Sequence, residues 1–84
     1  MQDYEYLFSK QLHEKLKDRV NGKVWVKIYH DELHVKITNY NEVSKYEFVM
    51  NNLSNDILNG LSSEYLVYAI LKDYRIYVNK LYFK

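Results

Sequence analysis

The first part of the chain repeats its hydrophobic residues at the spacing of an α-helix. The recurring residues are Tyr4, Leu7, Phe8, Leu12 and Leu16. Lysines and acidic residues fill the opposite side, so the pattern predicts an amphipathic helix with one face toward a core. Asp3 is placed to cap the start of this helix, and Asn21-Gly22 is placed to stop it.

The middle of the chain alternates apolar and polar residues with a period of two. The apolar set is Val24, Val26, Ile28, Leu33, Val35, Ile37, Tyr46, Phe48 and Met50. The three runs are separated by Asp31-Glu32 and by the polar residues 39–42. This pattern predicts a three-stranded antiparallel meander with one apolar and one mixed face.

The two connections define an expected register for the sheet. A two-residue turn at Asp31-Glu32 and a four-residue loop at Tyr40–Val43 bring inward residues opposite inward residues. The expected pairs are Ile28 with Val35, Val26 with Ile37, Val35 with Phe48, and Ile37 with Tyr46. On the other face Lys27 would lie beside Lys36, and Glu47 on the far side of Lys36 would offset this like-charge contact.

The last third of the chain returns to helical spacing. Ser54 can cap a short helix that ends at Gly60, and Ser62 can cap a long final helix. The core stripe of the final helix is Val67, Ile70, Leu71, Tyr74, Val78 and Leu81. Residues 74–78 are also rich in strand formers, so a C-terminal strand is the alternative, but the spacing favours a helix. The expected fold is α+β in the order α-β-β-β-α-α, with the helices packed on one face of the meander.

Composition limits the size and the chemistry of the protein. With 84 residues, of which 48% are hydrophobic and 17% aromatic, the chain suits one folded domain that spans residues 1–84. The absence of cysteine excludes disulfides and thiolate metal sites. A core this small cannot hold all ten tyrosines, so some must lie at the surface, where tyrosine is typical of binding sites.

Candidate catalytic groups are few. His30 and His34 flank the expected turn, with His30 toward the core side and His34 on the outer face, so they are not expected to share a metal. His13 lies among the polar residues of the first helix and is expected to be solvated. The chain has two glycines, too few for a phosphate-binding loop, and its acidic residues are scattered. We therefore expect no enzyme activity, no metal site and no cofactor.

The outer face of the expected sheet is the main candidate site. Its aromatic and basic residues are Trp25, Lys27, Tyr29, His34, Lys36 and Lys45. If the helices leave this face open, it can bind a protein with Trp25 as the anchor, or stack single-stranded bases while its lysines contact phosphates. The net charge of +1 favours a protein partner over nucleic acid. The alternative is that a terminus or the short helix shields Trp25.

The outer side of the final helix offers a second, weaker candidate surface. Its residues are Tyr68, Lys72, Arg75 and Asn79. Tyrosine and arginine are common at interfaces, although the same residues also suit an ordinary solvated helix face.

Residues 59–75 read Asn-Gly-Leu-Ser-Ser-Glu-Tyr-Leu-Val-Tyr-Ala-Ile-Leu-Lys-Asp-Tyr-Arg. This stretch resembles the closing helix of small uncharacterised proteins carried by bacteriophages and prophages. The order of elements is also similar to that of some compact phage anti-CRISPR inhibitors of CRISPR nucleases, although the inhibitors that mimic DNA are strongly acidic and this chain is not. The resemblance implies a small phage-type protein that binds a host protein, such as a defence nuclease, stoichiometrically.

Three functional hypotheses follow from the sequence. The first is a phage- or mobile-element-type protein that binds and modulates a host protein. The second is a nucleic-acid-binding module that uses the same outer face, and the third is a homodimer joined through sheet faces or last helices. No apolar run approaches the length of about 18 residues that spans a membrane, and Met1–Glu5 lacks the pattern of a signal peptide. A cytoplasmic location in the host cell is therefore expected.

Overall fold

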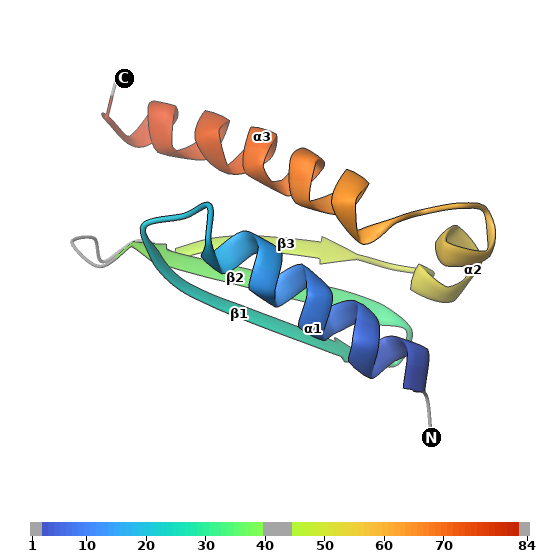
Figure 1. The fold of residues 1–84 in the computed structure, drawn as a ribbon. Coiled ribbons are helices and arrows are strands. Elements are labelled where there is room, and N and C mark those ends of the chain that lie inside the picture. Colours follow the sequence, from blue (N-terminus) through green and yellow to red (C-terminus); the bar gives the residue numbers. More distant parts are fainter. Residues whose placement is uncertain (1–2, 40–44, 83–84) are drawn as a thin grey trace.

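The computed structural model describes residues 3–39 and 45–82 and has the expected order of elements. The helices are α1 (Asp3–Lys17), α2 (Leu53–Leu58) and α3 (Ser63–Tyr82), and the strands are β1 (Gly22–Tyr29), β2 (Glu32–Asn39) and β3 (Lys45–Met50). The strands form one antiparallel sheet in the order β1-β2-β3. Figure 1 shows α1 and α3 forming a helical layer over this sheet, with α2 at the end of the sheet where β3 leaves it. The α+β fold predicted from the sequence is confirmed.

The core lies between the helical layer and the inward face of the sheet. Its fully buried side chains come from α1, β2, α2 and α3. They are Leu12, Leu16, Leu33, Val35, Ile37, Leu53 and Ile70. Each fully buried aliphatic side chain contributes about 1.5–3 kcal/mol of transfer free energy, so this layer supplies the main stabilisation of the fold.

The apolar stripe of α1 contacts the core from Phe8 onward. Leu12 and Leu16 are fully buried, whereas Tyr4 is 41% and Leu7 is 55% exposed. Each step of four residues rotates a side chain by about 40° around the helix, so the expected stripe turns away from the core over three steps. The prediction that all of these residues face the core is therefore wrong for Tyr4 and Leu7, and Phe8 packs against the core as expected.

The β1–β2 turn lies one residue earlier than the sequence suggested. His30 and Asp31 form it with φ angles of 53° and 60°, as in a type I′ turn. Ile28 consequently faces Leu33 rather than Val35, and Val26 faces Val35. A type I′ turn needs a positive φ at both central positions, and histidine and aspartate tolerate this conformation better than most residues. Moving the turn by one position shifts the pairing by two residues, so the inward set stays the same.

This register changes the outer face and the position of one histidine. Lys36 lies opposite Trp25, and Lys27 lies opposite His34, so the expected contact between the two lysines does not form. His30 is exposed in the turn and does not point to the core side as expected. A turn position removes a residue from the alternation of the strands, which explains the difference.

The register of β2 with β3 is confirmed. Val35 pairs with Phe48 and Lys36 pairs with Glu47, as the hydrophobic pattern predicts. The expected loop at Tyr40–Val43 lies outside the described residues.

The two C-terminal helices begin differently. Ser62 caps α3 as expected, because its Oγ accepts a hydrogen bond from the backbone N–H of Tyr65 at 3.1 Å. The expectation that Ser54 caps α2 is wrong: α2 begins at Leu53, and the residue before it, Asn52, has a φ of 57° and makes no capping bond. Residues 74–78 are part of α3, so the helix is confirmed and the alternative strand is not.

Candidate functional site

The outer sheet face is formed by the residues of the three strands that point away from the helical layer. Within the described part of the chain no helix covers it, since both long helices pack on the inward face. Its members are Lys23, Trp25, Lys27, Tyr29, Glu32, His34, Lys36, Thr38, Lys45, Glu47 and Val49. Trp25, Tyr29 and Val49 are 44%, 41% and 51% exposed. The six outer-face residues selected from the sequence therefore lie on one surface, and Trp25 is not shielded by α2.

Trp25 and Lys36 form a cross-strand pair on this surface. They are direct partners in the β1–β2 ladder, and the Lys36 Nζ lies 4.9 Å from the centre of the Trp25 ring. At this distance the ammonium group is attracted by the ring electrons, which contributes about 0.5–1 kcal/mol at an exposed position. The contact restricts both side chains before any partner is bound.

Tyr29 is held at the turn end of the same surface. Its ring stacks on His34 with centroids 4.5 Å apart and an interplanar angle of 6°. The Nε2 of His34 lies 3.1 Å from the Oε1 of Glu32, and the Lys27 Nζ lies 5.3 Å from the Tyr29 ring centre. These contacts fix the orientation of an exposed aromatic ring and lower the conformational entropy that it would lose on binding.

The outer sheet face carries more positive than negative charge. It has four lysines, Lys23, Lys27, Lys36 and Lys45, and two glutamates, Glu32 and Glu47. Lys36 lies between Trp25 on β1 and Glu47 on β3, so its charge is partly offset across the sheet. The surface is thus moderately basic, although the whole chain has a net charge of only +1.

The second predicted group, on α3, lies on a different surface. Tyr68 is 67% exposed, and Lys72 and Arg75 are exposed beside it. These three residues belong to the helical layer and line a groove next to the end of α1. The sequence predicted their exposure, but the structure does not join them to Trp25 in one contact surface.

The described histidines do not form a metal site. His13 is half-buried and donates its Nε2–H to the backbone carbonyl of Val24 at 3.0 Å, so the expectation of a solvated side chain is wrong. The bond joins α1 to β1. Because it depends on the packing of these two elements, the local sequence pattern around His13 does not predict it. Among residues 3–39 and 45–82, no three histidine, cysteine, aspartate or glutamate side chains come together as metal ligands.

Sequence reasoning missed a tyrosine cluster that fixes α3 on β3. The buried Tyr46 on β3 donates its hydroxyl to the Oδ2 of Asp73 at 2.6 Å. Tyr74 and Tyr77 on α3 contact its ring edge-on, each with centroids 5.5 Å away. Burial raises the pKa of the Tyr46 phenol well above its ordinary value, and the bond to Asp73 raises the pKa further. The cluster holds the two elements together and lies on the inward side of β3, opposite the outer sheet face.

No protein-family model, curated protein or solved structure matches the chain. Within the described residues, no helix combines the length and the apolar character needed to cross a membrane. The functional interpretation therefore depends on the two surfaces of the chain itself.

Proposed function

We propose that this protein acts by stoichiometric binding to another protein through the outer sheet face. The observation that carries the proposal is an open sheet surface on which Trp25 and Tyr29 are exposed and already oriented by their neighbours. Tryptophan and tyrosine are the residues most enriched at binding hot spots. An ordered aromatic pair loses little side-chain entropy on association, which favours a tight and specific contact.

A protein partner fits this face better than a nucleic acid does. The four lysines of the face are partly offset by two glutamates, and the net charge of the chain is only +1, so the electrostatic attraction on which nucleic-acid binding depends is small. The excess of lysines keeps nucleic acid as the second candidate, because lysines beside aromatics suit phosphates beside bases. Binding to nucleic acid would weaken steeply as salt is added, whereas an aromatic protein contact would change little.

The resemblance expected for residues 59–75 implies a phage-type protein, and on that expectation we propose a host protein as the partner. A counter-defence inhibitor of a CRISPR nuclease is one member of this class. The near-neutral net charge argues for inhibition by a protein–protein contact and against DNA mimicry, which needs a strongly acidic surface. Modulation of a host protein in the cytoplasm is the corresponding biological role in this proposal.

The proposal is tested by affinity purification of the tagged protein from bacterial lysate, with and without nuclease treatment, followed by quantitative mass spectrometry. One host protein should be recovered in near-equal amount with the wild type. Trp25→Ala should weaken its recovery strongly, because loss of a hot spot costs at least about 2 kcal/mol of binding. The matched control is Tyr65→Ala, which removes an aromatic side chain that is 64% exposed on α3.

Two results would contradict the proposal. Equal recovery by wild type and Trp25→Ala would show that the outer sheet face is not the contact. Recovery that disappears on nuclease treatment would transfer the function to nucleic acid, and Lys27 and Lys45 would then be the residues to replace.

A further inference from the structure

A groove of about 730 Å³ lies between the end of α1 and the middle of α3. Its lining comes from both helices and from the two residues that follow α1. The lining residues are Lys15, Asp18, Arg19, Glu64, Val67, Tyr68, Leu71, Lys72 and Arg75. The groove belongs to the helical layer, and the outer sheet face lies on the other side of the sheet. A ligand here would leave Trp25 and its neighbours free.

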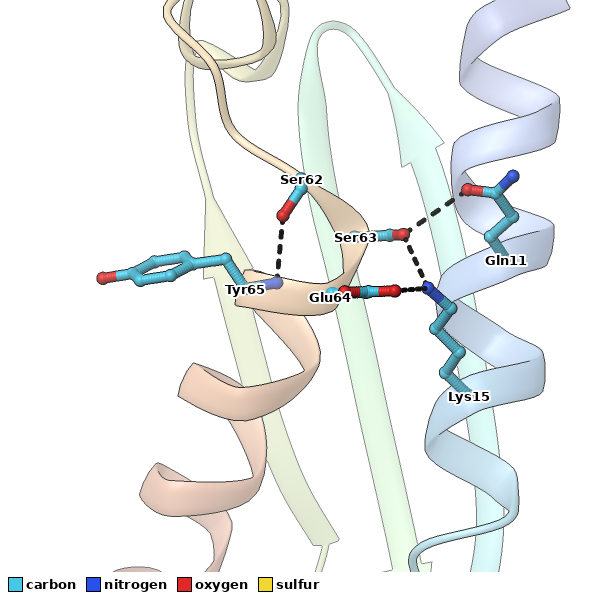
Figure 2. Close-up of polar contacts among 6 residues, drawn as sticks. All are labelled: Gln11, Lys15, Ser62, Ser63, Glu64 and Tyr65. Carbon is cyan, nitrogen blue, oxygen red and sulfur yellow. Dashed lines mark hydrogen bonds and ion pairs between the residues drawn. The ribbon is translucent and has the colours of Figure 1, made fainter.

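Three of the four cations around this groove form no ion pair within the described part of the chain. Lys15 lies 3.5 Å from the Oε1 of Glu64 and 3.4 Å from the Oγ of Ser63, as Figure 2 shows. By contrast Arg19, Lys72 and Arg75 are exposed and form no ion pair with any side chain in residues 3–39 and 45–82. Asp18 is the remaining acidic residue of the lining. The groove therefore has an excess of positive charge that is not neutralised within the described structure.

The groove also offers apolar surface. Val67 and Leu71 are 6% exposed each and are part of the core, while the Tyr68 ring on the same helix is 67% exposed. Positive side chains beside apolar surface suit a ligand that carries both carboxylates and apolar side chains. A phosphate backbone fits less well, because it has no apolar groups to place against the exposed ring of Tyr68.

We propose that this groove binds an acidic, amphipathic peptide segment of a protein partner. Arg19, Lys72 and Arg75 pair with its carboxylates, and the exposed ring of Tyr68 contacts its apolar side chains. The site stands apart from the outer sheet face and does not depend on the function assigned to that face. Together the two surfaces would let one small domain contact two protein surfaces at once, which raises the overall affinity for a partner that presents both.

The probe is a synthetic peptide with leucine at positions i, i+3, i+4 and i+7 and glutamate elsewhere, titrated into the isotope-labelled full chain and followed by NMR. The comparison peptide has lysine in place of every glutamate. The acidic peptide should shift the amide signals of Val67, Tyr68 and Leu71 and leave the Trp25 indole signal unchanged. The basic peptide should produce no shifts.

The matched variants change the same amount of charge at different places. Lys72→Glu with Arg75→Glu should weaken binding of the acidic peptide by about tenfold or more, since each exposed ion pair contributes up to about 1 kcal/mol. Lys10→Glu with Lys80→Glu replaces two exposed lysines outside the groove and should weaken binding less than about twofold. Circular dichroism spectra identical to the wild type confirm that both variants fold.

Four outcomes would overturn the proposal. These are an absence of shifts at millimolar acidic peptide, equal weakening by both double variants, equal binding of the basic peptide, and shifts centred on Trp25. A labelled oligothymidine that displaces the acidic peptide and binds more tightly would assign the groove to nucleic acid instead. Failure of the outer-face experiment with Trp25→Ala would leave each of these readouts unaffected.

Discussion

Asp31, in the β1–β2 turn, caps the N-terminus of α2 through Ser54. Its Oδ1 accepts a hydrogen bond from the Ser54 backbone N–H at 2.9 Å, and its Oδ2 accepts one from the Ser54 Oγ at 2.9 Å. The backbone carbonyl of Asp31 also accepts a bond from the N–H of Leu53 at 3.1 Å. The turn thus satisfies helix donors that Asn52 leaves without a side-chain cap.

Replacing the two turn residues separately should distinguish backbone strain from capping. His30→Gly relieves a positive φ and removes no described hydrogen bond of the turn, so we expect stabilisation by up to about 1 kcal/mol. Asp31→Gly relieves the same strain but loses the cap, so it should be about 1–2 kcal/mol less stable than His30→Gly. Urea unfolding of both variants measures this difference. Equal stability would show that the Asp31–Ser54 bonds contribute nothing to folding.

The adjacent serines at the start of α3 should behave differently. The Ser62 Oγ caps the helix at 3.1 Å from the Tyr65 N–H, and we expect Ser62→Ala to cost about 1 kcal/mol. The Ser63 Oγ has longer contacts of 3.4 Å with Gln11 and Lys15 on α1. Gln11 is exposed and Lys15 keeps Glu64 as a partner, so Ser63→Ala should cost less than about 0.5 kcal/mol. Thermal unfolding that reverses this order would make the α1–α3 junction in Figure 2 the stronger contact.

The Tyr46–Asp73 bond should make stability depend on pH on the alkaline side. The folded state raises the pKa of the Tyr46 phenol, whereas the unfolded chain releases this proton near pH of about 10. The contribution of the phenol to stability is therefore complete below about pH 10 and is lost as pH rises toward the folded-state pKa. Tyr46→Phe should cost about 0.5–1.5 kcal/mol near neutral pH, because it removes the bond and keeps the ring.

The difference between the wild type and Tyr46→Phe should shrink above about pH 10. Denaturant unfolding across this range measures it, and Tyr65→Phe controls for removing one exposed phenol. A constant difference between the wild type and Tyr46→Phe at all pH values would show that burial does not hold the proton of Tyr46.

Sequence periodicity was sufficient to predict the fold because the same residues face the core in the predicted and in the observed register. The turn prediction was wrong by one residue, yet Leu33, Val35 and Ile37 face the core in both registers. The set of residues that faces the core depends only on alternation along each strand. The register of β1 with β2 depends on which residues accept a positive φ in the turn. The hydrophobic pattern carries no direct information on the register. The predicted position of His30 was wrong for this reason.

The two candidate surfaces also differ in how much of each the local sequence pattern predicts. The outer sheet face could be predicted because its members alternate along three strands, and the exposure of Trp25 follows from that alternation. The α1–α3 groove could be predicted only on its α3 side, at Tyr68, Lys72 and Arg75. Lys15 and Arg19 join it through the packing of α1 against α3, and His13 meets Val24 in the same way. Contacts between elements distant in sequence have no local signal.

The proposed function requires that Trp25 be available for binding and that the fold does not depend on it. Its side chain is 44% exposed and lies on the face opposite the core, where it contacts Lys36. We therefore expect Trp25→Ala to reduce the free energy of unfolding by about 1–2 kcal/mol, through the lost cation–π contact and the lost packing of the covered part of the ring on its strand neighbours.

Leu33→Ala is the matched comparison, because Leu33 is fully buried on the neighbouring strand. This substitution should cost about 2–5 kcal/mol through lost burial and a cavity. Chemical unfolding of the two variants under one condition gives both values. A loss for Trp25→Ala as large as that for Leu33→Ala would make Trp25 a structural residue, and a binding defect of that variant would then report unfolding. A small loss with an intact circular dichroism spectrum makes Trp25→Ala a clean test of binding through the outer sheet face.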